Sequence, residues 1–280
     1  MIRRDVDDQC WLFTQHDHAL LAAEVAAHFG NEQFARPTPR EQTMLGVALH
    51  DCGWPLHDER PALNGGGLPM DVFETTRDWG LKIWTASAKR AAEEDAYAGL
   101  LVSQHSLALS VFATTQTGFV HEKFDIADPR ARFELNKFQH GQIELQEQLR
   151  RKLGLSTQHP LRHGLAEESD DERERQLVFN FRLLQAMDKL SLCICCTQPP
   201  FEQIEPLPPR PGEEPVALKV QRPDRHHLRV RPWPFDRPQL NVLIPYRPVP
   251  RRAYSEESQL HAVYADAPIR QLYCTIEPAA

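Results

Sequence analysis

Apolar residues in the first 195 positions recur with the three- and four-residue spacing of helices that bury one face. Residues that cap helix starts precede several of these segments. Thr14 precedes the first, and Thr38-Pro39-Arg40-Glu41 reads as a capping box with proline at the first helical position. Asp128-Pro129 and Ser169-Asp170-Asp171-Glu172 give similar signals further along. The pattern predicts helices over about 14–29, 38–51, 78–92, 96–115, 128–153 and 169–195.

The pattern changes near residue 198. Of the 23 prolines, 14 lie between 199 and 250, and no glycine follows Gly212. Short runs in this region are β-branched or alternate between apolar and polar residues, which is typical of strands. These runs are 216–220, 227–232, 240–246 and 271–276, and residues 9–15 form a similar run near the N-terminus. Proline within several runs favours sheet edges or bends.

Together these patterns predict a mainly α fold with a small antiparallel β subdomain formed by the C-terminal region, which the N-terminal strand could join. The expected units are an N-terminal strand at 1–13, a helical domain at 14–197, a proline-rich linker at 198–212 and a β subdomain at 213–280. Residues 52–69 contain three consecutive glycines and are expected to form a long loop that could cover a cleft as a lid.

Composition and charge narrow the classes of function. The 280 residues carry a net charge of −7 and no basic block, which argues against a nucleic-acid partner. No apolar run approaches the roughly 20 residues that span a bilayer, and the N-terminal residues lack the apolar segment of a signal peptide. The six cysteines are scattered apart from a cluster at 193–196, so we expect reduced thiols and a cytoplasmic location, with the cluster as small core residues. The sequence does not fix the oligomeric state.

Five titratable residues lie on helix faces that should be buried: His18, His50, Asp51, His105 and Asp188. Their neighbours at helical spacing are mostly leucine, valine and alanine. A buried carboxylate costs several kcal/mol unless it is paired, hydrogen-bonded or bound to a metal. A divalent cation neutralises carboxylates and accepts neutral imidazole nitrogens. The pattern therefore predicts that these side chains converge on a metal ion.

His50 and Asp51 are adjacent, and adjacent residues on a helix point in different directions. They can share one ion only where the helix ends or distorts. Cys52-Gly53, followed by Pro55, supplies such an ending. The pair is therefore predicted to lie at a helix C-terminus and to project into a cavity between helices.

The order His18, His50-Asp51 and Asp188 on successive helices, with Asp188 in the stretch QAMDKLS, resembles the HD-domain superfamily over about residues 14–196. The whole layout, with SQH at 103–105 and a proline-rich β tail, resembles a bacterial family of uncharacterised HD-like proteins. The resemblance implies an HD-domain-like helical core that holds one or two divalent ions, drawn from Fe, Mn, Zn, Ni and Mg. It implies hydrolysis of phosphomonoesters or phosphodiesters in most members, and oxygenation by two irons in some.

The chain departs from that pattern in two respects. Many HD hydrolases continue with Gly-Lys after the His-Asp pair, whereas Trp54 occupies the lysine position here. Members with two ions need further histidines between the pair and the last aspartate. His105 fits such a role by position, and a second could be His121 or His140.

We therefore expect a metal-dependent phosphohydrolase that uses a metal-activated water on a small phosphorylated substrate. The predicted metal ligands are His18, His50, Asp51, His105 and Asp188. The predicted catalytic residues are Asp51, His105, Asp58 and His57, with Lys189, Arg182, Lys82 and Lys89 as candidate phosphate contacts. A di-iron oxygenase and a non-catalytic module that binds a ligand or a protein are the alternatives.

Simpler structural roles stay open for the same residues. Residues 50–51 could cap the end of a helix, and Asp188 could form an ion pair with Arg182 or a distant lysine. His105 could be a buried structural histidine, and residues 57–58 could be polar residues of a loop. His16 also competes with His18 as the ligand on the first helix.

Overall fold

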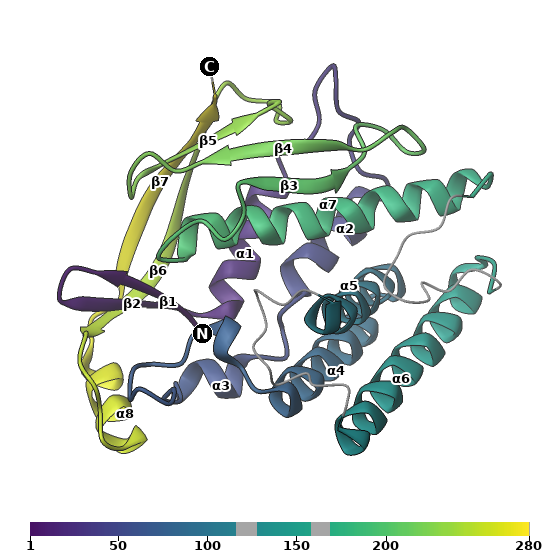
Figure 1. Ribbon diagram of the computed structural model, residues 1–280. Coiled ribbons are helices and arrows are strands. Elements are labelled where there is room, and N and C mark those ends of the chain that lie inside the picture. Colours follow the sequence, from purple (N-terminus) through teal and green to yellow (C-terminus); the bar gives the residue numbers. More distant parts are fainter. Residues whose placement is uncertain (116–127, 158–168, 280) are drawn as a thin grey trace.

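In the computed structural model, the chain folds into a curled sheet on one side and a group of helices on the other (Figure 1). The structure describes residues 1–115, 128–157 and 169–279. The helices are α1 (Gln15–Ala26), α2 (Arg40–Leu49), α3 (Pro55–Glu59), α4 (Arg77–Glu94), α5 (Ala96–Thr115), α6 (Pro129–Leu153), α7 (Glu172–Cys195) and α8 (Glu257–Asp266), with a 3₁₀ turn at Val72–Glu74. The strands are β1 (Ile2–Val6), β2 (Gln9–Phe13), β3 (Gln203–Leu207), β4 (Val216–Gln221), β5 (His227–Arg231), β6 (Leu240–Pro250) and β7 (Arg270–Pro278). None of the helices in these ranges is long and apolar enough to cross a membrane.

All seven strands in the described part of the chain belong to one sheet, in the order β1-β2-β6-β7-β5-β4-β3. Neighbouring strands are antiparallel except β5 and β7, which run parallel. The prediction of a mainly α fold with a small antiparallel β subdomain is therefore wrong, because helices take up 49% of the chain, strands 20%, and the sheet is large and mixed. The N-terminal strand does join the C-terminal strands, as the sequence analysis allowed, because β2 pairs with β6. Local patterns indicate single strands, and they give neither the number nor the order of the strands in the sheet.

Three segments account for the difference. The N-terminal region holds two strands instead of one, since the chain reverses at Asp7 (φ +51°) and β1 pairs with β2, which in turn pairs with β6. Strand β3 lies inside residues 198–212, which were expected to be a linker. Helix α8 lies within the region where only strands were predicted. The proposed division of the chain into domains stays a prediction.

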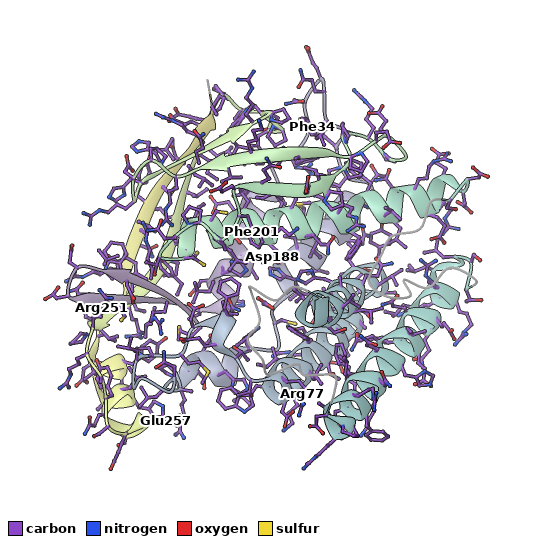
Figure 2. The ribbon with its side chains drawn as sticks, in the orientation of Figure 1. Phe34, Arg77, Asp188, Phe201, Arg251 and Glu257 are labelled. Atoms are coloured by element: carbon purple, nitrogen blue, oxygen red, sulfur yellow. The ribbon has the colours of Figure 1, made fainter. Side chains whose placement is uncertain are left out.

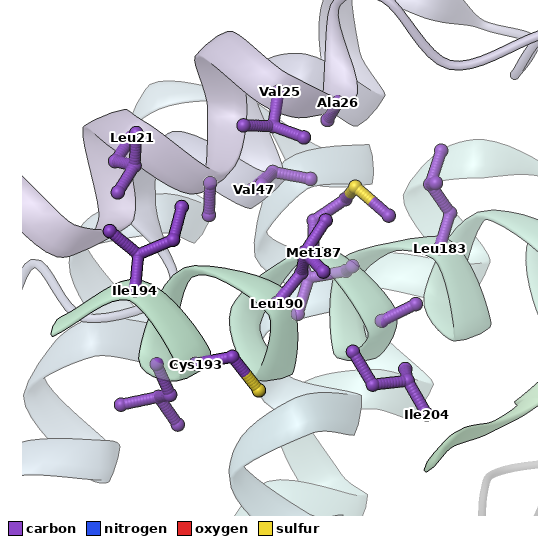
Figure 3. Packing of buried hydrophobic residues seen from close by; sticks show 14 of the residues in the cluster. Leu21, Val25, Ala26, Val47, Leu183, Met187, Leu190, Cys193, Ile194 and Ile204 are labelled. Carbon is purple, nitrogen blue, oxygen red and sulfur yellow. The ribbon is translucent and has the colours of Figure 1, made fainter. Parts of the chain in front are cut away.

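The inner face of the sheet packs on α1 and α7, which separate it from α4, α5 and α6 (Figure 1). Alternate residues along β6 are buried, as expected for a strand with one face on the core. Figure 3 shows Leu21 and Val25 of α1 with Met187 and Ile194 of α7 in the apolar cluster between these helices. Full burial of such a side chain stabilises the fold by about 1.5–3 kcal/mol. This packing fixes α1 and α7 relative to each other.

Helix starts agree with the sequence where the cap forms locally. Thr14 and Asp128 cap α1 and α6, and each side chain accepts a hydrogen bond from a backbone N–H of the first turn. The predicted capping box at Thr38 does not form, because Pro39 is the N-cap residue of α2 and makes no side-chain cap. Helix α7 begins after Asp171, two residues later than the predicted box.

Candidate metal centre

Five of the predicted site residues converge where four helices meet. His18 lies on α1, His50 and Asp51 follow the end of α2, His105 lies on α5 and Asp188 on α7. All five are buried, with exposed fractions between 1% and 8%. Figure 2 shows Asp188 near the middle of the molecule, on the side of α7 toward α5. The fold therefore brings together side chains up to 170 positions apart.

Helix α2 ends within two residues of its predicted end, and this ending lets adjacent residues face one centre. Leu49 is the last helical residue and His50 is the C-cap. The backbone N–H of Cys52 donates to the carbonyl oxygen of Leu49 at 3.0 Å, which closes a turn after the helix. His50 Nε2 and Asp51 Oδ2 consequently lie 3.6 Å apart.

Gly53 allows this turn to lie close to α4. A Cβ atom at this position would stand 2.3 Å from the carbonyl oxygen of Ile83 and 2.8 Å from Ser87 Oγ. The N–H of Gly53 instead donates to Ser87 Oγ at 2.9 Å. Glycine is therefore required for the close approach that holds the turn.

Two imidazole nitrogens each lie close to two carboxylate oxygens. His18 Nε2 lies 3.0 Å from Asp188 Oδ1 and 3.9 Å from Asp51 Oδ2. His50 Nε2 lies 3.5 Å from Asp188 Oδ1 and 3.6 Å from Asp51 Oδ2. Ligand atoms about 2.1 Å from an ion stand about 3.0 Å apart along the edge of an octahedron and about 3.4 Å apart along the edge of a tetrahedron. The measured separations are close to these values, so this group could hold a divalent ion.

Hydrogen bonds behind the imidazoles turn their Nε2 lone pairs toward the centre. His50 Nδ1 lies 2.7 Å from the carbonyl oxygen of Val47, which can only accept, so Nδ1 carries the proton. Ser191 Oγ donates to the carbonyl oxygen of Asp188 at 2.8 Å and lies 2.7 Å from His18 Nδ1, which must therefore donate to it. Such support fixes the tautomer of metal-binding histidines. His50 Nε2 is buried and has no hydrogen-bond partner among the described residues, a defect that a bound ion would remove.

Trp54 orients the Asp51 carboxylate. Its indole Nε1–H donates to Asp51 Oδ1 at 3.2 Å, which leaves Oδ2 facing the histidines. The indole here supports a candidate ligand and supplies no cationic phosphate contact.

The buried charges shift one another's pKa values. Burial by itself would lower the pKa of His50, but the charges of Asp51 and Asp188 outweigh burial and raise it to about 9. Burial by itself would raise the pKa of Asp188, but the neighbouring imidazoles of His18 and His50 hold it well below its usual range. Burial raises the pKa of Asp51. In the absence of an ion, a proton on His50 therefore balances the Asp188 carboxylate, and a cation would take its place.

His105 lies beside this group. Its Nε2 is 3.5 Å from Asp188 Oδ2, and its ring centroid is 5.4 Å from that of His50. Two overlapping sets have ligand atoms within 4.8 Å of one another: His18, His50 and Asp51, and His50, His105 and Asp188. Burial lowers the pKa of His105 to about 3. Its imidazole is therefore neutral near pH 7, which suits metal binding better than proton donation.

A cavity of about 180 Å³ adjoins the ligand atoms. His18, Asp51, His105 and Asp188 form part of its wall. Much of the remaining described wall is apolar or aromatic, including Trp54, Phe73, Trp84, Leu109 and Phe201. The polar residues of the wall that no metal would use include Gln15, Gln185 and Lys189. The centre is thus buried on one side and open to a small ligand on the other.

Asp58 and His57 were both predicted to be catalytic, but neither lies in the described wall of this cavity. Asp58 accepts a hydrogen bond from the N–H of Gln15 at 2.7 Å and lies 2.9 Å from the amino nitrogen of Met1. The ring of His57 packs on Trp79 with a centroid distance of 4.4 Å. Asp58 therefore joins the starts of β1 and α1.

Only one of the candidate phosphate contacts lines the cavity among the residues described. Lys189 lies in its wall, whereas Lys82 and Lys89 line a separate groove between α4 and α6. Arg182 donates to Gln185 Oε1 at 2.8 Å. The sequence could not show which of these four cationic residues lines the cavity, because that depends on how the helices pack against one another.

The segment predicted to be a lid, 52–69, contributes Trp54 to the described wall, and residues 72–76 contribute several side chains instead. The glycine-containing part of the loop lies against the C-terminal region instead. There the N–H of Tyr254 donates to the carbonyl oxygen of Gly67 at 2.8 Å, and His261 Nε2 donates to that of Pro61 at 3.1 Å. These contacts tie the loop to the segment around α8.

Gln15 and Ser191 are among the residues of the site that were not identified from the sequence. Gln15 lies three positions before His18 on α1, and Ser191 lies three positions after Asp188 on α7. A polar residue one helical turn from a candidate ligand is the signal that could have found both.

The remaining histidine candidates also have defined positions. His16 is exposed, so the candidate ligand on α1 is His18. His140 is exposed on α6, 3.2 Å from Glu144 Oε1. His121 lies outside the described residues. Cys193, Cys195 and Cys196 are buried in the main apolar cluster and form no disulfide.

Comparisons with known proteins give a match at the level of a family. The profile of one protein family, described as protein of unknown function (DUF3891), matches residues 1–251. No curated protein and no solved structure matches the chain.

Proposed function

Because the chain belongs to the DUF3891 family of proteins of unknown function, we propose its activity from the metal centre: a metal-dependent phosphohydrolase that acts on a small phosphomonoester or phosphodiester. One observation carries the proposal. The Nε2 atoms of His18 and His50 each lie 3.0–3.9 Å from a carboxylate oxygen of Asp51 and from one of Asp188, beside a cavity. The resemblance of His18, His50-Asp51 and Asp188 to the HD-domain motif supports the same activity.

The donor set suits a divalent cation of the first transition row, because it combines imidazole with carboxylate. His18, His50, Asp51 and Asp188 would hold it. A cation bound there lowers the pKa of water to about 7 in favourable sites and polarises a phosphoryl oxygen. In the hydrolysis, the water oxygen forms a bond to phosphorus, the bond from phosphorus to the alcohol oxygen breaks, and a proton passes from the water to the departing alcohol.

The chain's own residues supply the surroundings of this reaction. Ser191, the Val47 carbonyl and Trp54 keep the ligand atoms oriented before any ion binds. The apolar wall excludes bulk water, which strengthens electrostatic interactions at the centre. His105 is neutral and faces the second oxygen of Asp188, which supports a role as a further ligand.

The proposal is tested with protein purified without chelator. We expect one or two divalent ions per chain, and hydrolysis of p-nitrophenyl phosphate or bis(p-nitrophenyl) phosphate after loading with Mn²⁺, Fe²⁺ or Zn²⁺. His50→Ala should lose both the ion and the activity. His140→Ala, which removes an exposed histidine on α6, should keep both. Full hydrolysis by His50→Ala, or absence of ion binding by the unmodified chain, would contradict the proposal.

A di-iron oxygenase is the second candidate, and one observation favours it. The two oxygens of Asp188 face different imidazoles, Oδ1 toward His18 and His50 and Oδ2 toward His105, as a carboxylate shared by two ions would. Two irons per chain, an absorption band that changes on oxidation, and no phosphoester hydrolysis would favour this candidate. Loss of only one of two ions in His105→Ala would show that two ions share Asp188.

A further inference from the structure

The side chains that line the cavity beyond the metal centre indicate what kind of ligand the cavity could bind. Aromatic side chains come from several separate segments: Trp54 after α2, Phe73 in the 3₁₀ turn, Trp84 on α4 and Phe201 after α7. Aromatic walls pack best on flat apolar groups, with gains of about 0.5–1.5 kcal/mol for each ring pair beyond simple burial. The wall thus favours a ligand with an apolar, ring-sized part.

The volume limits the size of that part. A cavity of about 150 Å³ accommodates one benzene molecule, and pockets for drug-sized ligands span about 300–1,000 Å³. The cavity beside the centre measures about 180 Å³. It has room for a single ring together with a small polar group at the ligand atoms, and it is too small for a base, a sugar and a phosphate together.

The charge of the wall indicates what that polar group is. Within the described wall, Lys189 is the one lysine or arginine side chain. Its Nζ donates to the carbonyl oxygen of Glu205 at 3.0 Å and lies 5.5 Å from the ring centroid of Phe201, so the ammonium is held in place. An ammonium group has three N–H donors and the Glu205 carbonyl oxygen accepts one of them, so Lys189 can also donate a hydrogen bond to an anion.

A second unused polar group lies in the same wall. Gln15 is only 2% exposed, and its Oε1 has no hydrogen-bond partner among the described residues. A buried acceptor without a partner costs about 1–3 kcal/mol. A hydroxyl of the ligand, such as that of a singly protonated phosphate, would supply the missing donor.

We infer that the substrate is a small phosphate ester whose alcohol part is a single apolar or aromatic ring-sized group, with its phosphate contacted by Lys189 and its ring packed on Trp84 and Phe201. This inference rests on the proposed phosphohydrolase activity. It adds that the site discriminates against nucleotides, because a nucleotide exceeds the cavity and its second polar part would have no cation in the described wall.

Ligand binding tests the inference without turnover. Phenylphosphonate, methylphosphonate and adenosine monophosphate are titrated against the metal-loaded protein by calorimetry, with the fluorescence of Trp54 and Trp84 as a second readout. We expect phenylphosphonate to bind at least tenfold more tightly than either of the others. The methyl compound lacks the ring, and the nucleotide does not fit.

Two variants assign the contacts. Lys189→Met should weaken phenylphosphonate binding about tenfold at unchanged metal content, whereas Lys82→Met, which lies in the separate groove, should leave binding unchanged. Gln15→Leu replaces the unpartnered amide with an apolar group of similar size and should shift affinity toward phosphonates that lack an acidic hydroxyl. It provides a readout if Lys189→Met does not fold.

The outcomes separate this inference from the proposed function. Adenosine monophosphate binding as tightly as phenylphosphonate, or unchanged phenylphosphonate affinity in Lys189→Met, would overturn the inference even if phosphoesters are hydrolysed. Selective binding of phenylphosphonate without hydrolysis of phenyl phosphate would overturn the proposed function and leave the ligand class standing.

Discussion

At the scale of single residues, the candidate metal centre depends on groups that do not themselves face the ion. Ser191 fixes the tautomer of His18, the Val47 carbonyl fixes that of His50, and Trp54 turns Asp51. The chain could reveal the ligands because each is a titratable group on an apolar helix face. It could not reveal that Asp58 lies outside the cavity, because that depends on the approach of β1 and α1.

Replacing Ser191 should test the support of His18. Ser191→Ala removes the acceptor of the His18 Nδ1 proton, and we expect metal affinity to fall about 10- to 100-fold, the usual effect of removing such a partner. The affinity is measured by competition with a fluorescent chelator. Ser110→Ala, at a buried serine that donates to the carbonyl oxygen of Leu107, should leave metal affinity unchanged. Equal loss in both variants would mean that the effect is general destabilisation.

The charge state of His50 should make metal binding and stability depend on pH. Its pKa is raised to about 9 in the folded protein without an ion, against 6.5 for the unperturbed side chain. Protonation of His50 therefore stabilises the metal-free fold fully below about pH 6.5, and this contribution is lost as pH rises through about 9.

The ion needs a neutral imidazole, so apparent metal affinity should change in the opposite sense and rise between pH 6.5 and 9. Calorimetry in buffers of different ionisation enthalpy should detect about one proton released for each ion bound at pH 7.5. Binding without proton release would show that His50 is already neutral.

At the scale of elements, the position where α2 ends determines how the side chains of His50 and Asp51 face the candidate metal centre. The sequence predicted this end from Cys52-Gly53 and Pro55, since helix termination there is a local property of the chain. Caps at Thr14 and Asp128 were predictable for the same reason. The box at Thr38 was not formed, because α2 begins one residue later, with Pro39 as its N-cap residue.

Gly53→Ala should disturb the turn after α2. The added Cβ would collide with the Ile83 carbonyl at 2.3 Å, and overpacking of this kind costs about 1–3 kcal/mol. Because the turn carries Asp51, we expect weaker metal binding as well as a lower midpoint of urea unfolding. Gly65→Ala is the matched control, since a Cβ there meets nothing within 4 Å. Unchanged stability of Gly53→Ala would show that the turn and α4 can move apart.

At the scale of the whole molecule, sequence reasoning missed the size of the sheet and the order of its strands. Each strand except β1 and β3 left a local signal, and the N-terminal strand was expected to join the C-terminal ones, as β2 does by pairing with β6. The parallel pairing of β5 with β7 joins segments too distant for a local pattern to connect. The helical side was more predictable, because α4 to α7 follow from periodicity alone. The converging ligands were predictable as a set, whereas the cavity beside them required the placement of α4, α5 and α7.

One buried ion pair holds two long helices together across the molecule. Arg150 of α6 donates to Glu174 Oε1 of α7 at 2.7 Å, and their side chains are 2% and 5% exposed. Glu174→Ala leaves the guanidinium buried without its partner, which should lower the free energy of unfolding by about 3–5 kcal/mol. Chemical denaturation measures the change.

The exposed pair of Arg151 and Glu147, 3.9 Å apart, gives the comparison for this prediction. Glu147→Ala should change the free energy of unfolding by about 0–1 kcal/mol. Similar losses in the two variants would mean that burial of the first pair does not determine its contribution.

The place of β7 between β6 and β5 has a consequence for how the protein is made. This strand, residues 270–278, forms the junction between the two halves of the sheet, yet it is synthesised after all the others. During translation the edges of β5 and β6 that pair with β7 must therefore stay unpaired until residues 270–278 leave the ribosome. A nascent chain stalled before residue 270 should be a strong client of chaperones.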